Sequence, residues 1–337
     1  KTLSLWVKRG SLGSEQRLAN SNSANAATTF LRFDAADTLT FQFEGSSGIL
    51  LTTTQVFRDP SAWYHIVVSI DTTQTTAANR EIIYVNGVQV TSFSSTDYPT
   101  QNRNMSIFAS GTQYIGYSTP GNNFSDGFMS EVFYIDGQQL TASSFGQTDS
   151  ATGVWVPKKY IGTYGNNGFY LPFTDTSSTT NLVKDSSGNA NNWTPNNISL
   201  TAGTTYDSMI DVPYCTGQVG GTQPSGNYPT LNPVVTGSYN STTPAQGNLA
   251  LPSGTAANRQ CLGTMSFPST GKYYFECTNT VASSGGGIGI SAYGSDIMNS
   301  GVSGPFYVYL ATSGNKDSAR PVNVAYGASW DSNTETI

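Results

Sequence analysis

The chain has 337 residues and a formal net charge of −6; 11 % of its residues are charged, 12 % are aromatic, and Ser, Thr, Asn and Gly are abundant. The low charge content excludes a coiled coil or long-helix protein, and the aromatic content excludes a disordered chain. An acidic chain without a basic stripe is not expected to bind nucleic acid, and no apolar run is long enough for membrane insertion. We therefore predict an all-β protein of two or three domains.

Residues 1–150 are predicted to form one β-sandwich domain, because short alternating runs are separated by clusters of turn residues. The alternation begins with the very first residues, so this domain is expected to lack its first strands and to follow a further segment. The final residues likewise show no turn or cap that would mark a natural end. Strands are predicted at 2–8, 28–33, 38–43, 49–53, 63–71, 81–85, 89–93, 113–117 and 128–135.

The dipeptide Asn86-Gly87 stands between two alternating runs and is the strongest turn signal in the chain. A type I′ turn needs a positive φ at both central residues, which Asn and Gly tolerate best. The sequence therefore predicts a two-residue hairpin in which Val85 pairs with Val88. A second turn is predicted at Asp136-Gly137, where the strand 128–135 ends.

The rest of the chain is predicted to hold a connecting region and a second domain. Residues 151–226 are rich in Gly, Asn and Ser and are expected to lie on the sandwich with short strands of their own, the best of them at 169–173. Residues 227–337 are expected to form a second, smaller β-sandwich that is incomplete. No amphipathic helix is expected anywhere.

Several stretches, taken together, resemble one known family. They are 3–13 (LSLWVKRGSLG), 57–71 (FRDPSAWYHIVVSID), 79–91 (NREIIYVNGVQVT), 124–140 (FSDGFMSEVFYIDGQQL), 153–175 (GVWVPKKYIGTYGNNGFYLPFTD), 185–199 (DSSGNANNWTPNNIS) and 206–213 (YDSMIDVP). The family is the laminin-G-like, concanavalin-A-like jelly-roll domain, in the version found in virion proteins of marine bacteriophages of the tail-fibre type. The resemblance implies a concanavalin-A-like jelly-roll sandwich for the first domain.

A second resemblance concerns the C-terminal part. Residues 271–280 (GKYYFECTNT) and 285–294 (GGGIGISAYG) are similar to the opening strands of a SPRY domain, which is also a β-sandwich. That family continues with a strand containing Gly-Asp and with an Asn-Gly hairpin. Neither occurs before Ile337, so the SPRY-like domain is expected to be truncated or divergent.

Catalytic arrangements are not predicted. Retaining glycosidases need two carboxylates close together on one face, whereas Glu131 and Asp136 are five residues apart and point to opposite faces. We interpret Glu131 as a solvated edge acid and Asp136 as a turn residue. His65, the single histidine, lies in a strand pattern and is expected to be a hydrogen-bonded structural residue.

Ligand binding is predicted at the loop that precedes the strand 128–135. Asn122, Asn123, Phe124 and Asp126 bring two amides, a ring and a carboxylate together within a few residues. Some laminin-G-like domains bind calcium at the rim of the sandwich, so the resemblance implies a possible calcium ligand at Asp126, although no cofactor is required. The stretch Asp185-Ser186-Ser187-Gly188-Asn189 fails the pattern of a calcium loop at Ala190 and Asn196 and is interpreted as a turn that caps its own backbone.

Sugar recognition needs aromatic faces beside amide or carboxylate groups, and several aromatics meet that description. They are Tyr98, Tyr117, Phe124, Tyr160, Tyr164 and Trp193. For any single one of them, however, the favoured interpretation is that it fastens a loop to the sandwich. The resemblance implies a fibre-like adhesin on the virion surface that binds host cell-surface polysaccharide and other virion proteins, as a homo-oligomer that is a trimer by family analogy. A capsid or tail decoration protein making only protein–protein contacts is the alternative, and a glycoside hydrolase the weaker one.

Overall fold

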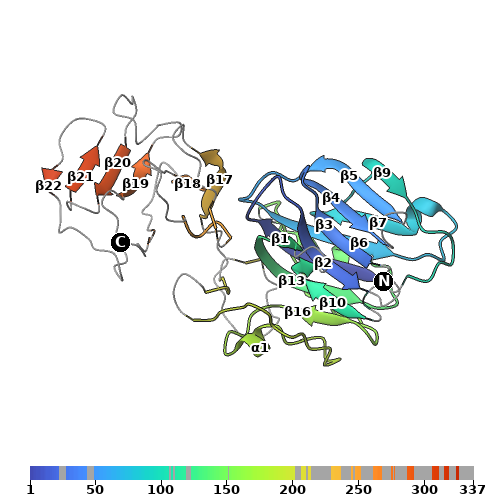
Figure 1. Cartoon of the computed structure of the whole chain (residues 1–337). Coiled ribbons are helices and arrows are strands. Elements are labelled where there is room, and N and C mark those ends of the chain that lie inside the picture. The colour runs from blue at the N-terminus through green and yellow to red at the C-terminus, as the bar shows by residue number, and fades with distance from the viewer. Residues whose placement is uncertain are drawn as a thin grey trace. The chain divides into compact units, whose positions relative to one another are not determined.

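A computed structural model confirms the all-β prediction (Figure 1). It describes residues 1–22, 28–43, 49–105, 108, 111–118, 123–150, 152–201, 206–209, 212–213, 229–236, 244–245, 247–251, 261–267, 275, 277, 287–291, 306–310, 315–318 and 324–325. The chain divides into two compact units, of which the first comprises Lys1–Thr230 with Ala245–Ala250 and the second the remainder. Helices in the described part are single turns: η2 (Ala77–Asn79), η3 (Ala142–Ser144) and α1 (Thr179–Leu182).

The first unit is a sandwich of two six-stranded antiparallel sheets. Sheet A has the order β16 (Phe169–Leu171), β13 (Gly127–Ile135), β1 (Thr2–Arg9), β6 (Trp63–Ile70), β7 (Glu81–Val85) and β8 (Val88–Gln89). Sheet B has the order β10 (Thr112–Ile115), β2 (Gln16–Asn22), β3 (Thr28–Phe33), β4 (Thr38–Gln42), β5 (Leu50–Val56) and β9 (Phe93–Asp97). Two small ribbons, β11 (Tyr117–Ser118) with β12 (Asn123–Phe124) and β14 (Gly146–Thr148) with β15 (Trp155–Pro157), complete the described sheets of this unit.

The core lies between the two sheets, where the alternating apolar side chains of both meet. In β3, Leu31 and Phe33 are buried in this core, while Phe30 and Arg32 lie on the opposite face of sheet B. A strand has a side-chain period of two, so this alternation fixes which face is inside. We call the side of each sheet away from the core its outer face.

Most predicted strands are confirmed, and the exceptions have local causes. The strand predicted at 89–93 is wrong, because the chain leaves sheet A after β8 and enters sheet B at β9. The strand predicted at 113–117 is interrupted at Gly116, whose φ of 75° separates β10 from β11. β2 was not predicted, because its outer face is polar and its apolar side chains do not alternate regularly.

The Asn86-Gly87 hairpin is confirmed. Asn86 and Gly87 have φ values of 47° and 83°, and Val85 pairs with Val88 across the turn. Asn86 also closes the end of the neighbouring strand, since its amide donates to the His65 carbonyl and its Oδ1 accepts from the His65 amide, both at 2.8 Å.

Gly87→Ala is expected to destabilise the chain more than Gly137→Ala. Both glycines have a φ of 83°, so both alanines would pay about 1 kcal/mol for the left-handed backbone. A Cβ at Gly87 would also lie 2.8 Å from the Trp155 ring, whereas a Cβ at Gly137 would meet no atom within 4 Å. We expect Gly87→Ala to lose a further 1–3 kcal/mol, about the cost of overpacking, in urea unfolding. Equal losses in the two variants would show that Trp155 does not pack on this turn.

The outer face of sheet A is covered by the segment that follows β13. A second apolar cluster lies there, in which Phe133 stacks on Tyr170 with ring centroids 4.2 Å apart. His65 lies on the same face, fully buried, between Ser4 and Trp155. The prediction of a structural histidine is thus confirmed.

A buried ion pair joins the two sheets. Arg9, at the end of β1, has a fully buried side chain whose Nη2 lies 3.0 Å from Oδ1 of Asp37, in the turn between β3 and β4. Arg9 Nη1 donates to the Phe57 carbonyl at 2.5 Å, and Arg58 Nε donates to the other Asp37 oxygen at 2.9 Å. The sandwich therefore depends on a charge pair as well as on apolar packing.

The second unit contains two antiparallel sheets in the described residues. One pairs β17 (Leu231–Thr236) with β18 (Cys261–Gly263). The other has the order β19 (Gly287–Ser291), β20 (Phe306–Leu310), β21 (Asn315–Ser318) and β22 (Val324–Ala325). The SPRY-like character of this unit stays a prediction.

Candidate functional site

The ribbon β11–β12, which contains part of the predicted binding loop, is fastened to the outer face of sheet B. Asn20 of β2 donates to the Ser118 hydroxyl at 3.0 Å, and Asn123 donates to Oε1 of Glu15 at 2.6 Å. The Gly116 amide donates to the Leu18 carbonyl at 2.9 Å. Backbone and side-chain bonds to the region of β2 thus hold this ribbon in a defined position.

The other face of the ribbon carries aromatic side chains. Tyr117 and Phe124 are directly opposite each other in the pairing, and their ring centroids are 4.8 Å apart at 34°. Tyr114, at the adjoining edge strand, meets Tyr117 edge-on at 5.2 Å. Phe124 is 57 % exposed, whereas Phe is one of the residue types most often buried. We call Tyr114, Tyr117 and Phe124 the aromatic patch.

A group of charged side chains lies beside the ribbon on sheet B. Arg17 of β2 and Arg32 of β3 are directly opposite each other, and their guanidinium carbons lie 3.7 and 4.5 Å from the centroid of the Phe30 ring. Glu15 pairs with both arginines, at 2.7 Å from Arg17 Nε and 3.2 Å from Arg32 Nη1. Asp34 pairs with Arg32 Nε. We call Glu15, Arg17, Arg32 and Asp34 the charged cluster.

The charged cluster is half-buried, which affects its electrostatics. Burial lowers the pKa of Arg17, and the neighbouring Glu15 carboxylate opposes that shift. The side chains of Arg17 and Arg32 are 12 % and 19 % exposed, and those of Glu15 and Asp34 are 28 % and 22 % exposed. The cluster has two positive and two negative groups, so its formal charge is balanced.

The four predicted site residues have different positions. Phe124 is presented to solvent, as a binding ring would be, whereas the Asn123 amide is engaged with Glu15. The carboxylate of Asp126 packs on Gly10 of the β1 end, where a Cβ would lie 2.7 Å from its Oδ1. Asn122 lies outside the described residues. The structure therefore separates the ring and one amide, which join the ribbon, from the Asp126 carboxylate, which contacts Gly10.

Most of the other aromatic candidates fasten loops to the sandwich. Tyr160 is buried in the cluster on sheet A, and Tyr164 packs edge-on against it at 5.2 Å. Trp193 packs on Phe169 at 5.0 Å, and Tyr98 contacts the main core. Only Tyr117 and Phe124, among the six candidates, stand together at the surface in the described structure.

The stretch 185–189 is confirmed as a self-capping turn. The two oxygens of Asp185 accept four hydrogen bonds, from the amides of Tyr170, Ser187 and Asn191 and from the Ser187 hydroxyl, at 2.8–2.9 Å. Each lone pair of the Asp185 carboxylate therefore already has a donor from the protein.

The interpretation of Glu131 as a solvated edge acid is wrong. The pairing of β1 with β13 shifts between Ser4 and Trp6, so two residues of β13 face Leu5 alone and form a β-bulge. Glu131 occupies the bulge with a φ of 51°, is 2 % exposed, and accepts a hydrogen bond from the Tyr170 hydroxyl at 2.8 Å. Asp136 lies in the predicted turn and accepts from the Asn167 amide at 2.9 Å.

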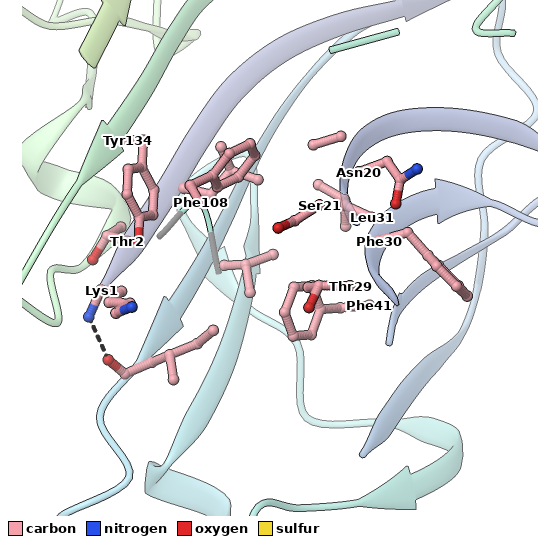
Figure 2. A pocket seen from close by; sticks show the side chains of 14 residues that line it. Lys1, Thr2, Asn20, Ser21, Thr29, Phe30, Leu31, Phe41, Phe108 and Tyr134 are labelled. Carbon is pink, nitrogen blue, oxygen red and sulfur yellow. Dashed lines mark hydrogen bonds between the residues drawn. The ribbon is translucent and has the colours of Figure 1, made fainter. Parts of the chain in front are cut away.

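A cavity inside the sandwich is too small for a sugar. It lies between the sheets, holds about 10 Å³, and is lined by core residues such as Leu3, Leu31 and Phe41 together with Lys1, whose backbone nitrogen donates to the Ile70 carbonyl (Figure 2). This is about the space of one water molecule. This cavity therefore cannot hold a saccharide ligand.

In the part of the chain that the structure describes, no three or more His, Cys, Asp or Glu side chains are grouped so that they could hold a metal ion. No helix among the described residues has the length and apolar character needed to cross a membrane.

Comparisons with known proteins identify the sandwich. Residues 1–143 match the family model Laminin_G_3, described as the Concanavalin A-like lectin/glucanases superfamily. Together with the two facing sheets, this match defines residues 1–143 as a domain of that superfamily, and its lectin-like fold is consistent with carbohydrate binding.

No curated protein matches the chain. Among solved structures, the chain is similar to a native heptameric SAP-like pentraxin from Limulus polyphemus, with 17 % sequence identity and a TM-score of 0.29. The alignment covers 39 % of this chain and 61 % of the pentraxin chain, so less than two thirds of that relative is spanned.

Proposed function

We propose that this chain is a non-enzymatic glycan-binding protein whose aromatic patch stacks on sugar rings. The observation that carries the proposal is the exposed Phe124 ring, held against Tyr117 on a ribbon that is itself fastened to sheet B. A rigid aromatic face attracts the apolar C–H face of a pyranose, and the polar groups beside it offer hydrogen bonds for the hydroxyls. The lectin-like fold of residues 1–143 supports this proposal.

The proposal includes the setting that the sequence resemblance implies. The chain would act as a fibre-like adhesin on the surface of a phage virion, bound to other virion proteins and assembled as a homo-oligomer, with a host surface polysaccharide as its target. A decoration protein would instead cover the aromatic patch with a neighbouring protein. Glycan binding and burial of this patch are therefore the outcomes that separate the two proposals.

We propose no catalysis, because the nearest carboxylate pair of the strand β13 is unsuited to it. Glu131 is buried beneath Tyr170, where a glycosidic bond would not reach it, and Asp136 is engaged by the turn around Asn167. A polysaccharide-degrading enzyme would need two carboxylates facing one sugar.

Calcium at Asp126 is part of the proposal as an accessory ligand. Its carboxylate accepts no hydrogen bond from the described residues, so its oxygens are available to a cation. Calcium needs six to eight oxygens, and the remaining ligands would be backbone carbonyls and water. An Asp126 site would make glycan binding sensitive to a chelator.

Phe124→Ala is expected to weaken glycan binding at least about tenfold while changing the free energy of unfolding by less than about 0.5 kcal/mol, because its ring is mostly exposed. The measurement is a glycan array read with the wild type, with Phe124→Ala and with Ile161→Ala, each with calcium or with EDTA. Ile161 is 90 % exposed and serves as the matched control, because it removes an apolar side chain elsewhere on the surface. Binding by all three proteins at equal strength, or by none, would contradict the proposal.

A further inference from the structure

The two arginines of the charged cluster lie side by side on the outer face of sheet B, and Glu15 pairs with both of them. Arg17 and Arg32 face each other directly across β2 and β3, and like charges in that position repel. Both guanidinium groups lie over the single ring of Phe30, which is thereby 7 % exposed. The arrangement holds two planar donor groups in fixed orientations on the outer face of sheet B.

The carboxylates of the cluster are already occupied. Oε1 of Glu15 accepts from Arg17 Nε at 2.7 Å and from the Asn123 amide at 2.6 Å, and Oε2 pairs with Arg32 Nη1 at 3.2 Å. Asp34 accepts from Arg32 Nε and from the Thr40 hydroxyl. These bonds use most of the acceptor sites of the two carboxylates, so fewer acceptors than donors remain for the hydroxyl groups of a neutral sugar.

The guanidinium groups, by contrast, have donors to spare. Each guanidinium carries five N–H bonds, and the carboxylates of Glu15 and Asp34 engage only Nε of Arg17 and Nε and Nη1 of Arg32. Arg17 Nη1 is buried, so it is not a donor that a ligand can reach. Among the described residues, no acceptor bonds to Nη2 of either arginine. The cluster thus has an excess of donors over acceptors, although its formal charge is balanced.

We propose that the charged cluster binds an anionic group of the glycan, a carboxylate or a sulfate ester, through Nη2 of Arg32 and Nη2 of its neighbour Arg17. This inference rests on the proposed function, since the same glycan would stack on the aromatic patch. An anionic group offers only acceptors and so matches a surface rich in donors, and its oxygens fit the fork of a guanidinium. The glycan class is therefore acidic.

The test compares three polymers with one backbone. Dextran is neutral, carboxymethyl dextran carries carboxylates and dextran sulfate carries sulfate esters, so differences in affinity at equal chain length report the anionic group alone. We expect at least one charged polymer to bind about tenfold or more tightly than dextran, and we expect this preference to decrease as salt screens it. Which charged polymer binds better distinguishes a uronate from a sulfate ester.

Variants locate the effect. Arg32→Gln is expected to abolish the preference for the charged polymer, and Arg32→Lys, which keeps the charge but loses the planar fork, to retain part of it. Lys158→Gln removes the same charge from an exposed residue that donates to the Ser143 carbonyl, and it is expected to keep the full preference. The thermal midpoint of each variant shows whether its fold is intact.

The possible failures are distinguishable. If dextran binds as tightly as both charged polymers and Phe124→Ala weakens all three, the acidic-glycan inference is wrong and the proposed function stands. If the preference exists but Lys158→Gln removes it as fully as Arg32→Gln does, the preference is a general charge effect and the cluster is not its site. If none of the polymers binds, the inference is overturned, and the glycan array alone decides the proposed function.

Discussion

Replacing Asp37 by Asn is expected to lower the free energy of unfolding by about 3–5 kcal/mol, because it leaves the buried guanidinium of Arg9 without its counter-charge. Asn keeps the shape of Asp and tolerates the φ of 64° found at this position, so the loss isolates the charge. Burial by itself would raise the pKa of Asp37, but hydrogen bonds from the Gly13 amide and Arg58 and the positive charge of Arg9 lower it below its usual range.

The measurement is urea unfolding of Asp37→Asn beside Asp59→Asn. Asp59 lies in an exposed turn, where its carboxylate accepts from Ser61, so its substitution is expected to change stability by less than about 0.5 kcal/mol. A small loss in both variants would mean that Arg9 is not dependent on its charge partner and that the ion pair does not join the sheets.

Acid is expected to destabilise the sandwich through His65, with a loss of about 2 kcal/mol between pH 7 and pH 5 from this residue alone. Nδ1 of His65 accepts from the Trp155 indole at 2.9 Å, and an indole N–H only donates, so the ring is neutral with its proton on Nε2 toward Ser4. Burial lowers the pKa of His65 to about 3.

The sign follows from the proton balance. Below pH 6.5 the unfolded chain binds a proton at His65 that the folded chain refuses, so stability falls as the pH decreases toward 3. Urea unfolding of the wild type and of His65→Gln at pH 7, 6 and 5 isolates this contribution as the difference between the two slopes. The variant is expected to be less stable at pH 7 and less sensitive to acid, and parallel slopes would contradict the account.

The sequence predicts well what depends on neighbouring residues. The Asn86-Gly87 turn needs only two positive φ values, so its dipeptide suffices to place it. Phe124 was predicted as a binding residue because a ring in a polar loop stands out, and its role in binding stays a prediction. The strand β2 was not predicted from the sequence, because Arg17 and Asn20 on its outer face are residues typical of a loop.

The parts that sequence reasoning missed depend on pairing between distant strands. Arg17 lies opposite Arg32 because of the register between β2 and β3, which shifts between Arg17 and Ala19. No local sequence pattern indicates this shift. Glu131 is buried because a bulge turns it toward Tyr170, a residue supplied by a later segment. The sequence predicted that the side-chain amide of Asn123 would be available to a ligand. In the structure this amide donates to Glu15, which directly precedes β2.

The most direct test of glycan binding at the aromatic patch is an amide chemical-shift map of the isotope-labelled chain with the oligosaccharide that the array binds best. The account predicts that the largest changes fall on 114–117, 123–124 and the strand residues beside them, Arg17 and Arg32, and that Phe124→Ala reduces them. Changes confined to the second unit, or to the segment that covers the outer face of sheet A, would contradict it.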